Sequence, residues 1–159
     1  MDTPLVLLDL VGVATDPCSG RAPAAQQTEA VRAVCIATGV PASQVFAASV
    51  QPNTIFPADF GGNPNLGAEK SDTWTVGVVF TPRFAPRLSI SVDYFNITLN
   101  GAIASLGGGL QNTLNLCYNV LQDASSEFCQ AIRRSPTTGE INDPYVAQIR
   151  NANTGALKT

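Results

Sequence analysis

Histidine is absent from this 159-residue chain, and charged side chains are scarce. Without imidazole, the sequence excludes Ser-His-Asp triads, Cys-His pairs, His-ligated zinc and histidine general bases. Charged residues make up 13% of the chain, about half of the roughly 25% that is usual in soluble domains. The net charge is −3, and the only lysines are Lys70 and Lys158. We therefore expect no basic patch for phosphates and no nucleic-acid partner.

Long apolar runs are also missing. The opening run Leu5–Leu8 is interrupted by Asp9 and has no basic segment before it. It therefore predicts neither a signal peptide nor a transmembrane helix, which needs about 20 apolar residues. If the protein is exported, its export signal is not in this chain, and we expect the chain to be a fragment. The length alone leaves room for one domain with a modest core.

The four cysteines occur as two local pairs, without any Cys-x-x-Cys spacing. That spacing pattern excludes a zinc ribbon and a thioredoxin-type dithiol. An even number of cysteines at these separations favours an oxidising compartment. Three pairings are open, as is a set of four free thiols. Sequential pairing closes the shortest loops, so we predict the disulfides Cys18–Cys35 and Cys117–Cys129.

Two long loop-like segments enclose a strand-rich segment, residues 63–100. The first, residues 1–62, carries a predicted helix near 28–38 with Thr28 as its N-cap. Val31, Val34 and Cys35 form an apolar stripe on this helix, and Gly39 and Pro41 end it.

The second loop-like segment is residues 101–159. A short helix is predicted near 125–134, with Phe128, Cys129 and Ile132 turned inward and Arg133 and Arg134 at its C-terminal end. The tail, residues 152–159, is predicted to begin a further strand.

A β-hairpin is predicted from strands at about 71–81 and 87–99, because apolar side chains recur at every second position. Pro82 and Pro86 lack backbone donors and place the turn between the strands. The predicted apolar face carries Trp74, Val76, Val78, Phe80, Leu88, Ile90, Val92 and Tyr94. The small and polar face carries Thr75, Gly77, Ser89, Ser91 and Asp93.

A turn centred on Phe84 sets the predicted register, in which Trp74 faces Tyr94. The other predicted pairs are Val76–Val92, Val78–Ile90, Phe80–Leu88, Thr75–Asp93 and Gly77–Ser91. After Tyr94 the alternation shifts to Phe95, Ile97 and Leu99, which predicts a bulge or a strand that leaves its two-faced environment.

Two interpretations fit this alternation. In a soluble sandwich the apolar face is the core, whereas in a transmembrane barrel it faces lipid and the polar face lines the lumen. Both strands reach the roughly 9–11 residues that span a membrane. Trp74 and Tyr94 at one end, with Phe80 and Phe84 at the other, are arranged like two aromatic girdles. Long excursions beside one tight turn favour the barrel, with short periplasmic turns and long outer loops.

The sequence also resembles a known family. Asn63–Leu66 followed by Glu69–Gly77 is similar to the Asn-Pro-x-Leu-x-Pro-Glu-Lys-Ser segment of TonB-dependent outer-membrane receptors, with Ala68 where the family usually has proline. Leu88–Ile97 resembles the family's next barrel strand. The contexts of the two cysteine pairs resemble loop cysteines of one large proteobacterial branch, and Asn153–Thr159 resembles the entry to a further strand.

This resemblance implies a mainly β fold, an antiparallel hairpin from a transmembrane β-barrel with long loops that contain short helices. Family members are 22-stranded barrels with a plug in the lumen. They import siderophores, cobalamin or oligosaccharides with energy relayed by TonB. The implied partners are outer-membrane lipid of a Gram-negative bacterium, the rest of the barrel and plug, TonB only through that plug, and a small nutrient. This chain lacks the plug and most strands, so we expect a receptor fragment that does not transport alone.

The other residue groups give weaker evidence for a functional site. We read Glu69, Lys70 and Asp72 as a solvated turn, and Gly107–Gly109 as a loop, since it lacks the lysine of a phosphate loop. The N-glycosylation sequon Asn96–Thr98 is interpreted as a chance match. No catalytic residue, cofactor or metal ligand is predicted, and a hydrolase lacks a nucleophile–base pair. The loop aromatics suit either ligand contact or packing: Phe46, Phe56, Phe60, Tyr118 and Tyr145. The alternative function is a secreted, disulfide-stapled β-rich binding module.

Overall fold

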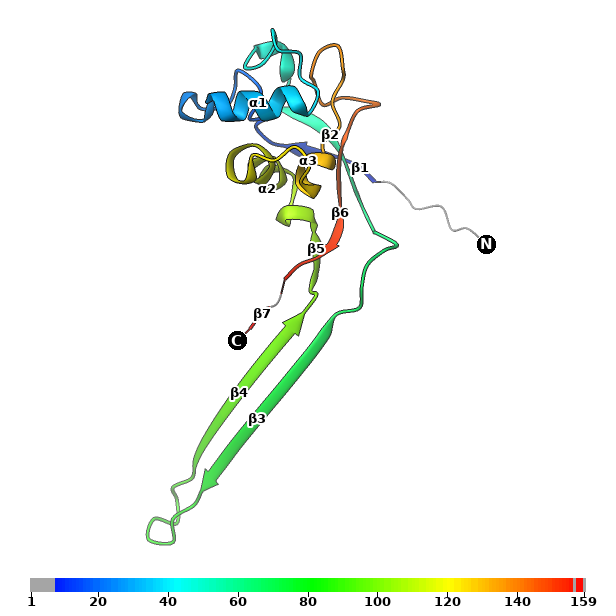
Figure 1. Cartoon of the computed structure of the whole chain (residues 1–159). Coiled ribbons are helices and arrows are strands. Elements are labelled where there is room, and N and C mark those ends of the chain that lie inside the picture. Colours follow the sequence, from blue (N-terminus) through cyan, green and yellow to red (C-terminus); the bar gives the residue numbers. More distant parts are fainter. Residues whose placement is uncertain (1–7, 156, 159) are drawn as a thin grey trace, which may run out of the picture. The chain divides into compact units, whose positions relative to one another are not determined.

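The structure is a computed structural model that describes residues 8–155 and 157–158 (Figure 1). The start of the apolar run, residues 5–7, lies outside this range. The chain forms two compact units. The first combines the chain up to Pro64 with Ala104–Ala152, and the second combines Asn65–Ile103 with the chain from Asn153 onward. Within the described residues, no helix has the length and apolar character needed to cross a membrane.

The first unit is built on a small mixed sheet with the strand order β1-β2-β6-β5. Its strands are β1 (Leu8–Val13), β2 (Ile55–Gly61), β5 (Ile103–Ser105, which begins in the second unit) and β6 (Ala147–Asn153). β2 pairs antiparallel with β1 and parallel with β6. Both loop-like segments thus contribute strands to one sheet. The predicted mainly β class needs correction, because the chain is mixed helix and strand.

Helices cover much of this unit, and α1 (Glu29–Ala37) confirms the helix predicted near 28–38. The Thr28 hydroxyl accepts a hydrogen bond from the Val31 amide at 3.3 Å, as an N-cap does. The remaining helical elements are η1 (Ala24–Gln26), η2 (Ala48–Val50), η3 (Leu106–Gly108), α2 (Leu110–Asn115), η4 (Leu116–Leu121, a π-helix) and α3 (Glu127–Gln130).

The second half of this unit differs from the prediction in two ways. The helix expected near 125–134 is only the single turn α3, capped by the Ser126 hydroxyl. Gly107–Gly109 was read as a loop and has non-helical φ angles of 61°, 78° and 123°, but the helix α2 that begins directly after it was not predicted. Leu110, Leu114 and Cys117 follow at helical spacing and are buried, so a helical signal was present.

The core of the first unit contains both disulfides. Cys18 is bonded to Cys35 and Cys117 to Cys129, which are the two sequential pairs. All four cysteines are at most 2% exposed, and the stripe residues Val31 and Val34 pack with them. Each disulfide stays within one of the two loop-like segments. The contacts that join these segments are therefore noncovalent.

The second unit is a long hairpin with the strand order β3-β4-β7. Figure 1 shows β3 (Lys70–Phe80) and β4 (Ile90–Asn100) as two antiparallel strands of equal length. The last strand, β7 (Leu157–Lys158), pairs antiparallel with β4 at Thr98 and Leu99. The further strand predicted in the tail is confirmed.

The predicted register was wrong by two residues. Trp74 pairs with Asn96, Val76 with Tyr94, Val78 with Val92 and Phe80 with Ile90, while Thr75 pairs with Phe95, Gly77 with Asp93 and Val79 with Ser91. The cause is the longer connection between the strands. It holds two successive turns, closed by bonds from the Ala85 amide to Pro82 and from the Leu88 amide to Ala85.

A shift of two residues preserves the two faces, because side chains alternate with a period of two. Leu88 and Ser89 lie in the connection and not in β4, so the predicted pair Phe80–Leu88 is replaced. The ladder is unbroken from Lys70–Asn100 to Phe80–Ile90, so the predicted bulge after Tyr94 is also wrong. After Tyr94 the apolar residues change from one face of β4 to the other, although the strand itself stays regular.

Candidate functional site

One face of the hairpin is apolar and open. Seven of the eight residues that were predicted for the apolar face lie on it, and each of them is between 46% and 66% exposed. They are Trp74, Val76, Val78, Phe80, Ile90, Val92 and Tyr94. Trp74 and Tyr94 are diagonal neighbours across the two strands and their rings meet edge to face, with centroids 5.5 Å apart. This face is a continuous apolar surface that ends in an aromatic pair.

The opposite face is polar at its middle. Asp93 lies beside Gly77 rather than beside Thr75 as predicted. A Cβ at residue 77 would collide with the Asp93 carboxylate, so the glycine leaves the space that this carboxylate occupies. Ser91 and Thr75 lie on the same face. Towards the ends of the strands the face becomes more apolar, with Val79 on one side and Phe95 on the other.

Polar side chains join the strand ends near Lys70 and Asn100. The Asn153 carboxamide accepts a bond from the Gly67 amide at 2.7 Å and donates to the Gly101 carbonyl at 2.7 Å. Glu69 accepts a bond from the Ile103 amide at 2.6 Å. Glu69 was read as part of a solvated turn at a strand entry; it is exposed directly before β3 and in addition holds the strand end through this bond.

A buried ion pair lies at the centre of the first unit. The Arg134 guanidinium donates to both carboxylate oxygens of Asp16, at 2.6 and 2.8 Å, and the two side chains are 0% and 2% exposed. Arg134 also donates to the Gly139 carbonyl at 2.9 Å, while Asp16 accepts from the Cys18 amide. The sequence predicted Arg134 at a helix end, and that reading was wrong because the side chain turns inward.

Tyr118 completes this network. Its hydroxyl accepts a bond from Arg134 Nε at 3.0 Å and lies 3.0 Å from the Thr38 hydroxyl. Burial raises the pKa of the Tyr118 hydroxyl above its ordinary value; the Arg134 charge opposes this rise in part, and the nearby Asp16 carboxylate adds to it. For Arg134, burial opposes the charge, but Asp16 and Tyr118 outweigh it and raise the pKa of the guanidinium further. The arginine is therefore charged at every accessible pH.

The loop aromatics are mainly packing residues. Tyr118 is fully buried, and Phe46 and Phe60 pack against the core. Tyr145 is 36% exposed. Of the two readings left open, packing is correct for Tyr118, Phe46 and Phe60.

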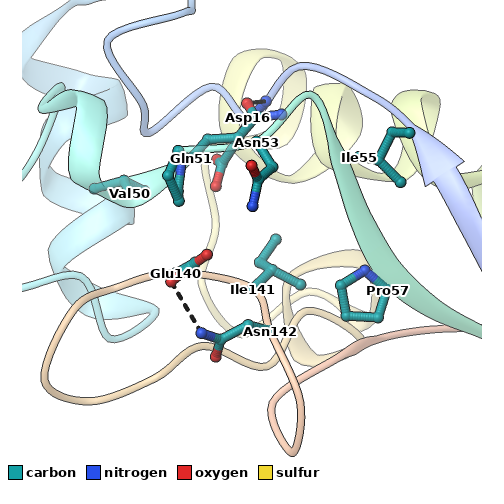
Figure 2. Close-up of a pocket in the computed structure, with 10 residues that line it drawn as sticks. Asp16, Val50, Gln51, Asn53, Ile55, Pro57, Glu140, Ile141 and Asn142 are labelled. Carbon is teal, nitrogen blue, oxygen red and sulfur yellow. Dashed lines mark hydrogen bonds between the residues drawn. The ribbon is translucent and has the colours of Figure 1, made fainter.

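A small pocket lies between η2, β2 and the loop before β6. Its volume is about 90 Å³, enough for a few waters. Figure 2 shows Glu140 and Asn142, joined by a 2.9 Å hydrogen bond, across the pocket from Asn53 and Gln51. Asp16 also lines the pocket, but its carboxylate is committed to Arg134. In the part of the chain that is described, no cluster of three or more His, Cys, Asp or Glu side chains could hold a metal ion.

Comparison with known proteins gives one match. A family model described as "TonB dependent receptor-like, beta-barrel" matches residues 21–149. Neither the search of curated proteins nor the search of solved structures gave a match. The matched region covers well over half of the chain and contains the whole hairpin, the disulfide Cys117–Cys129, Cys35 and Arg134, whereas Cys18 and Asp16 precede it. The chain therefore belongs to the TonB-dependent receptor-like β-barrel family.

Proposed function

We propose that this chain forms part of a TonB-dependent receptor in the outer membrane of a Gram-negative bacterium. Such a receptor would take up a scarce nutrient of the siderophore, cobalamin or carbohydrate class, with energy relayed by TonB through a plug. The family comprises receptors and transporters rather than enzymes. In this role the hairpin belongs to the barrel wall, and the disulfide-bonded first unit stands on the extracellular side.

The open apolar face of the hairpin carries this proposal. Every residue of β3 is exposed, including Trp74, Val76 and Val78. In a soluble sandwich this face would be buried against a second sheet. Side chains of this kind that remain open along a strand of membrane-spanning length are suited to lipid. The same feature disfavours the alternative of a secreted binding module.

The hairpin needs further strands to work in a membrane. Two long strands cannot close into a barrel, and open strand edges in lipid leave unpaired backbone groups at high cost. We therefore assign β3, β4 and β7 to neighbouring positions in a barrel wall that the remainder of a receptor completes. On this assignment Thr75, Gly77, Ser91 and Asp93 face the lumen, and a chain without that remainder does not transport.

The single tryptophan provides the test. The full chain, refolded in detergent, is reconstituted into phosphatidylcholine vesicles whose acyl chains carry bromine, which quenches tryptophan on contact. We expect strong quenching of Trp74, and stronger quenching from bromine near the headgroup than from bromine near the bilayer centre. Fluorescence equal to that in unbrominated vesicles would exclude lipid contact of this face. Cooperative folding of the chain in plain buffer, without detergent, would support the secreted module.

A further inference from the structure

A wide hollow lies in the first unit beside η1, α2 and η4. Its volume is about 550 Å³, within the range of roughly 300–1,000 Å³ that is typical of small-molecule sites. Five carboxamide side chains line it: Gln26, Gln111, Asn112, Asn115 and Asn119. The other described residues of its lining are apolar or glycine, and none of the lining residues carries a charge.

Hydrogen bonds hold these carboxamides in place. Gln111 accepts from the Thr15 amide at 2.7 Å and donates to the Thr15 carbonyl at 3.2 Å, so its carboxamide is held by the Thr15 backbone. Asn119 donates to Asn115 at 3.0 Å and, more weakly, to Gln26 at 3.5 Å. Asn112 donates to the Gly107 carbonyl at 2.6 Å. The lining is therefore ordered by its own contacts.

Within the described part of the chain, these hydrogen bonds leave amide donors and carbonyl acceptors of neighbouring side chains without protein partners. Among the described contacts, the amide nitrogens of Gln26 and Asn115 have no protein acceptor, and the carbonyl oxygens of Asn119 and Asn112 have no protein donor. A hydroxyl group donates one hydrogen bond and accepts others, so adjacent hydroxyls match such a mixed set. A charged ligand finds no countercharge here, and desolvating an unpaired charge is costly.

The backbone beside the carboxamides leaves room for a ligand. Gly108 and Gly109 have φ angles of 78° and 123°, and a Cβ built on either glycine would have nothing within 4 Å. A side chain at Gly109 would be strained at this φ angle. A ligand can therefore approach the main chain here without displacing protein atoms.

We infer that this hollow is a binding site for a neutral, hydroxyl-rich ligand, a saccharide. The inference rests on the proposed function, because it selects the carbohydrate class among the nutrients that such a receptor takes up. It assigns the contact to the first unit, with Gln26 and Asn115 as donors and Asn119 and Asn112 as acceptors. A few such hydrogen bonds give weak binding of a single short chain.

The test uses the full chain in lauryldimethylamine oxide, because sugar-based detergents would compete. Saturation-transfer NMR measures binding of maltotriose and xylotriose as neutral probes. Trigalacturonate and fully deacetylated chitotriose serve as anionic and cationic probes, and N-acetyl-trialanine amide as a neutral peptide. We expect at least one neutral trisaccharide to bind and both charged ones to give no signal.

Two substitutions locate the site. Asn115→Leu keeps the branched shape and the number of side-chain heavy atoms but removes the carboxamide, and we expect it to weaken saccharide binding at least fivefold. Asn53→Leu is the matched control, an exposed asparagine that lines the separate small pocket, and we expect it to leave binding unchanged. Near-ultraviolet circular dichroism verifies that both variants fold.

Three results would overturn the inference: no binding across an array of neutral glycans, equal binding by Asn115→Leu and the wild type, or preferential binding of the peptide or of a charged trisaccharide. None of these bears on the quenching of Trp74 by brominated lipid. Failure of the saccharide site and failure of the membrane assignment are therefore distinguishable.

Discussion

Arg134 joins several distant parts of the interior of the first unit. It is a fully buried cation with three kinds of partner: the Asp16 carboxylate, the Tyr118 hydroxyl and the Gly139 carbonyl. A buried pair of this kind adds little net stability over a well-packed apolar core, but removing one partner leaves an uncompensated charge. The network therefore makes the fold intolerant of change at these positions.

Replacing Arg134 by methionine tests this dependence. The substitution leaves the Asp16 carboxylate buried without its counterion, so we expect a loss of about 3–5 kcal/mol in the free energy of unfolding. Urea unfolding of the full chain in detergent, followed by the tyrosine band in near-ultraviolet circular dichroism, measures it. Arg133→Met is the matched control, because Arg133 is an exposed neighbour. Equal effects of the two substitutions would refute the role of the ion pair.

Alkaline pH tests the same network through Tyr118. Its folded-state pKa lies above the value in the unfolded chain, which is about 10. The stabilisation linked to the protonated hydroxyl is thus complete below about pH 10 and is lost as the pH rises through the folded pKa. We expect a late phase in the tyrosinate absorbance near 295 nm, accompanied by unfolding. This phase should be missing in Tyr118→Phe, and its persistence there would assign it to another tyrosine.

Local signals at the residue scale were readable from the sequence, whereas distant partners were not. Thr28 and the stripe of Val31, Val34 and Cys35 predicted α1, because a cap and a helical period depend on neighbours three or four residues away. The Asp16–Arg134 pair joins residues 118 positions apart. Next to Arg133, Arg134 looks like one of two equivalent charges at a helix end, and only the fold distinguishes them.

At the scale of elements, the two faces of the hairpin differ in their chemistry. The strands are regular throughout, and what changes along them is the chemistry of each face. Between Trp74 and Phe80 the apolar face carries no charge, while Lys70 and Asp72 precede it and Arg83 follows in the connection. From Thr73 to Thr81 the chain rises about 26 Å at about 3.3 Å per residue, or roughly 20 Å along the membrane normal at a tilt near 40°. This height covers most of an outer-membrane apolar band of about 25 Å.

Adjacent valines near the middle of the segment from Thr73 to Thr81 test which face meets lipid. Val78 lies on the apolar face opposite Val92, and Val79 lies on the other face opposite Ser91; both side chains are well exposed. We expect Val78→Arg to weaken insertion into vesicles by about 2–4 kcal/mol, since arginine at the bilayer midplane is costly. We expect Val79→Arg to have little effect. Flotation of vesicles with the bound chain measures both.

The reverse order, with Val79→Arg more harmful than Val78→Arg, would exchange the lipid and lumen faces. Equal effects would mean that neither face is preferred. Which residues share a face follows from the period of two, and the strand register agrees with that grouping. The register was harder to predict, because the length of the turn that begins with Thr81 cannot be read from proline positions alone. An error of an even number of residues exchanges partners and leaves faces intact.

At the scale of the whole chain, the two segments that flank the hairpin in sequence form one unit. β2 and β6 pair in parallel, Asp16 binds Arg134, and Thr38 meets Tyr118. Both disulfides are local, with separations of 17 and 12 residues. The sequence predicted the helices and cysteines of each segment separately. Their association was not predictable, because parallel pairing of strands this far apart has no local signal.

This arrangement predicts how the chain behaves when its hairpin connection is cut. A site-specific protease sequence inserted between Arg83 and Phe84, in the exposed connection, divides the chain into halves that each contribute to the first unit. We expect the halves to stay together through their noncovalent contacts and to co-elute at the size of the uncut chain. Non-reducing gel electrophoresis in dodecyl sulfate should give two bands, because neither disulfide joins the halves.

The ion pair is one of the contacts that join the cut halves, beside the pairing of β3 with β4 and of β2 with β6. Asp16 comes from one half and Arg134 from the other, and the Thr38–Tyr118 contact likewise joins the two. In the cut chain, Arg134→Met should therefore lower the urea concentration at which the halves separate, while Arg133→Met should not. Separation of the wild-type halves in the absence of denaturant would contradict a single first unit. It would mean that each segment folds on its own disulfide and that the contacts between them contribute little.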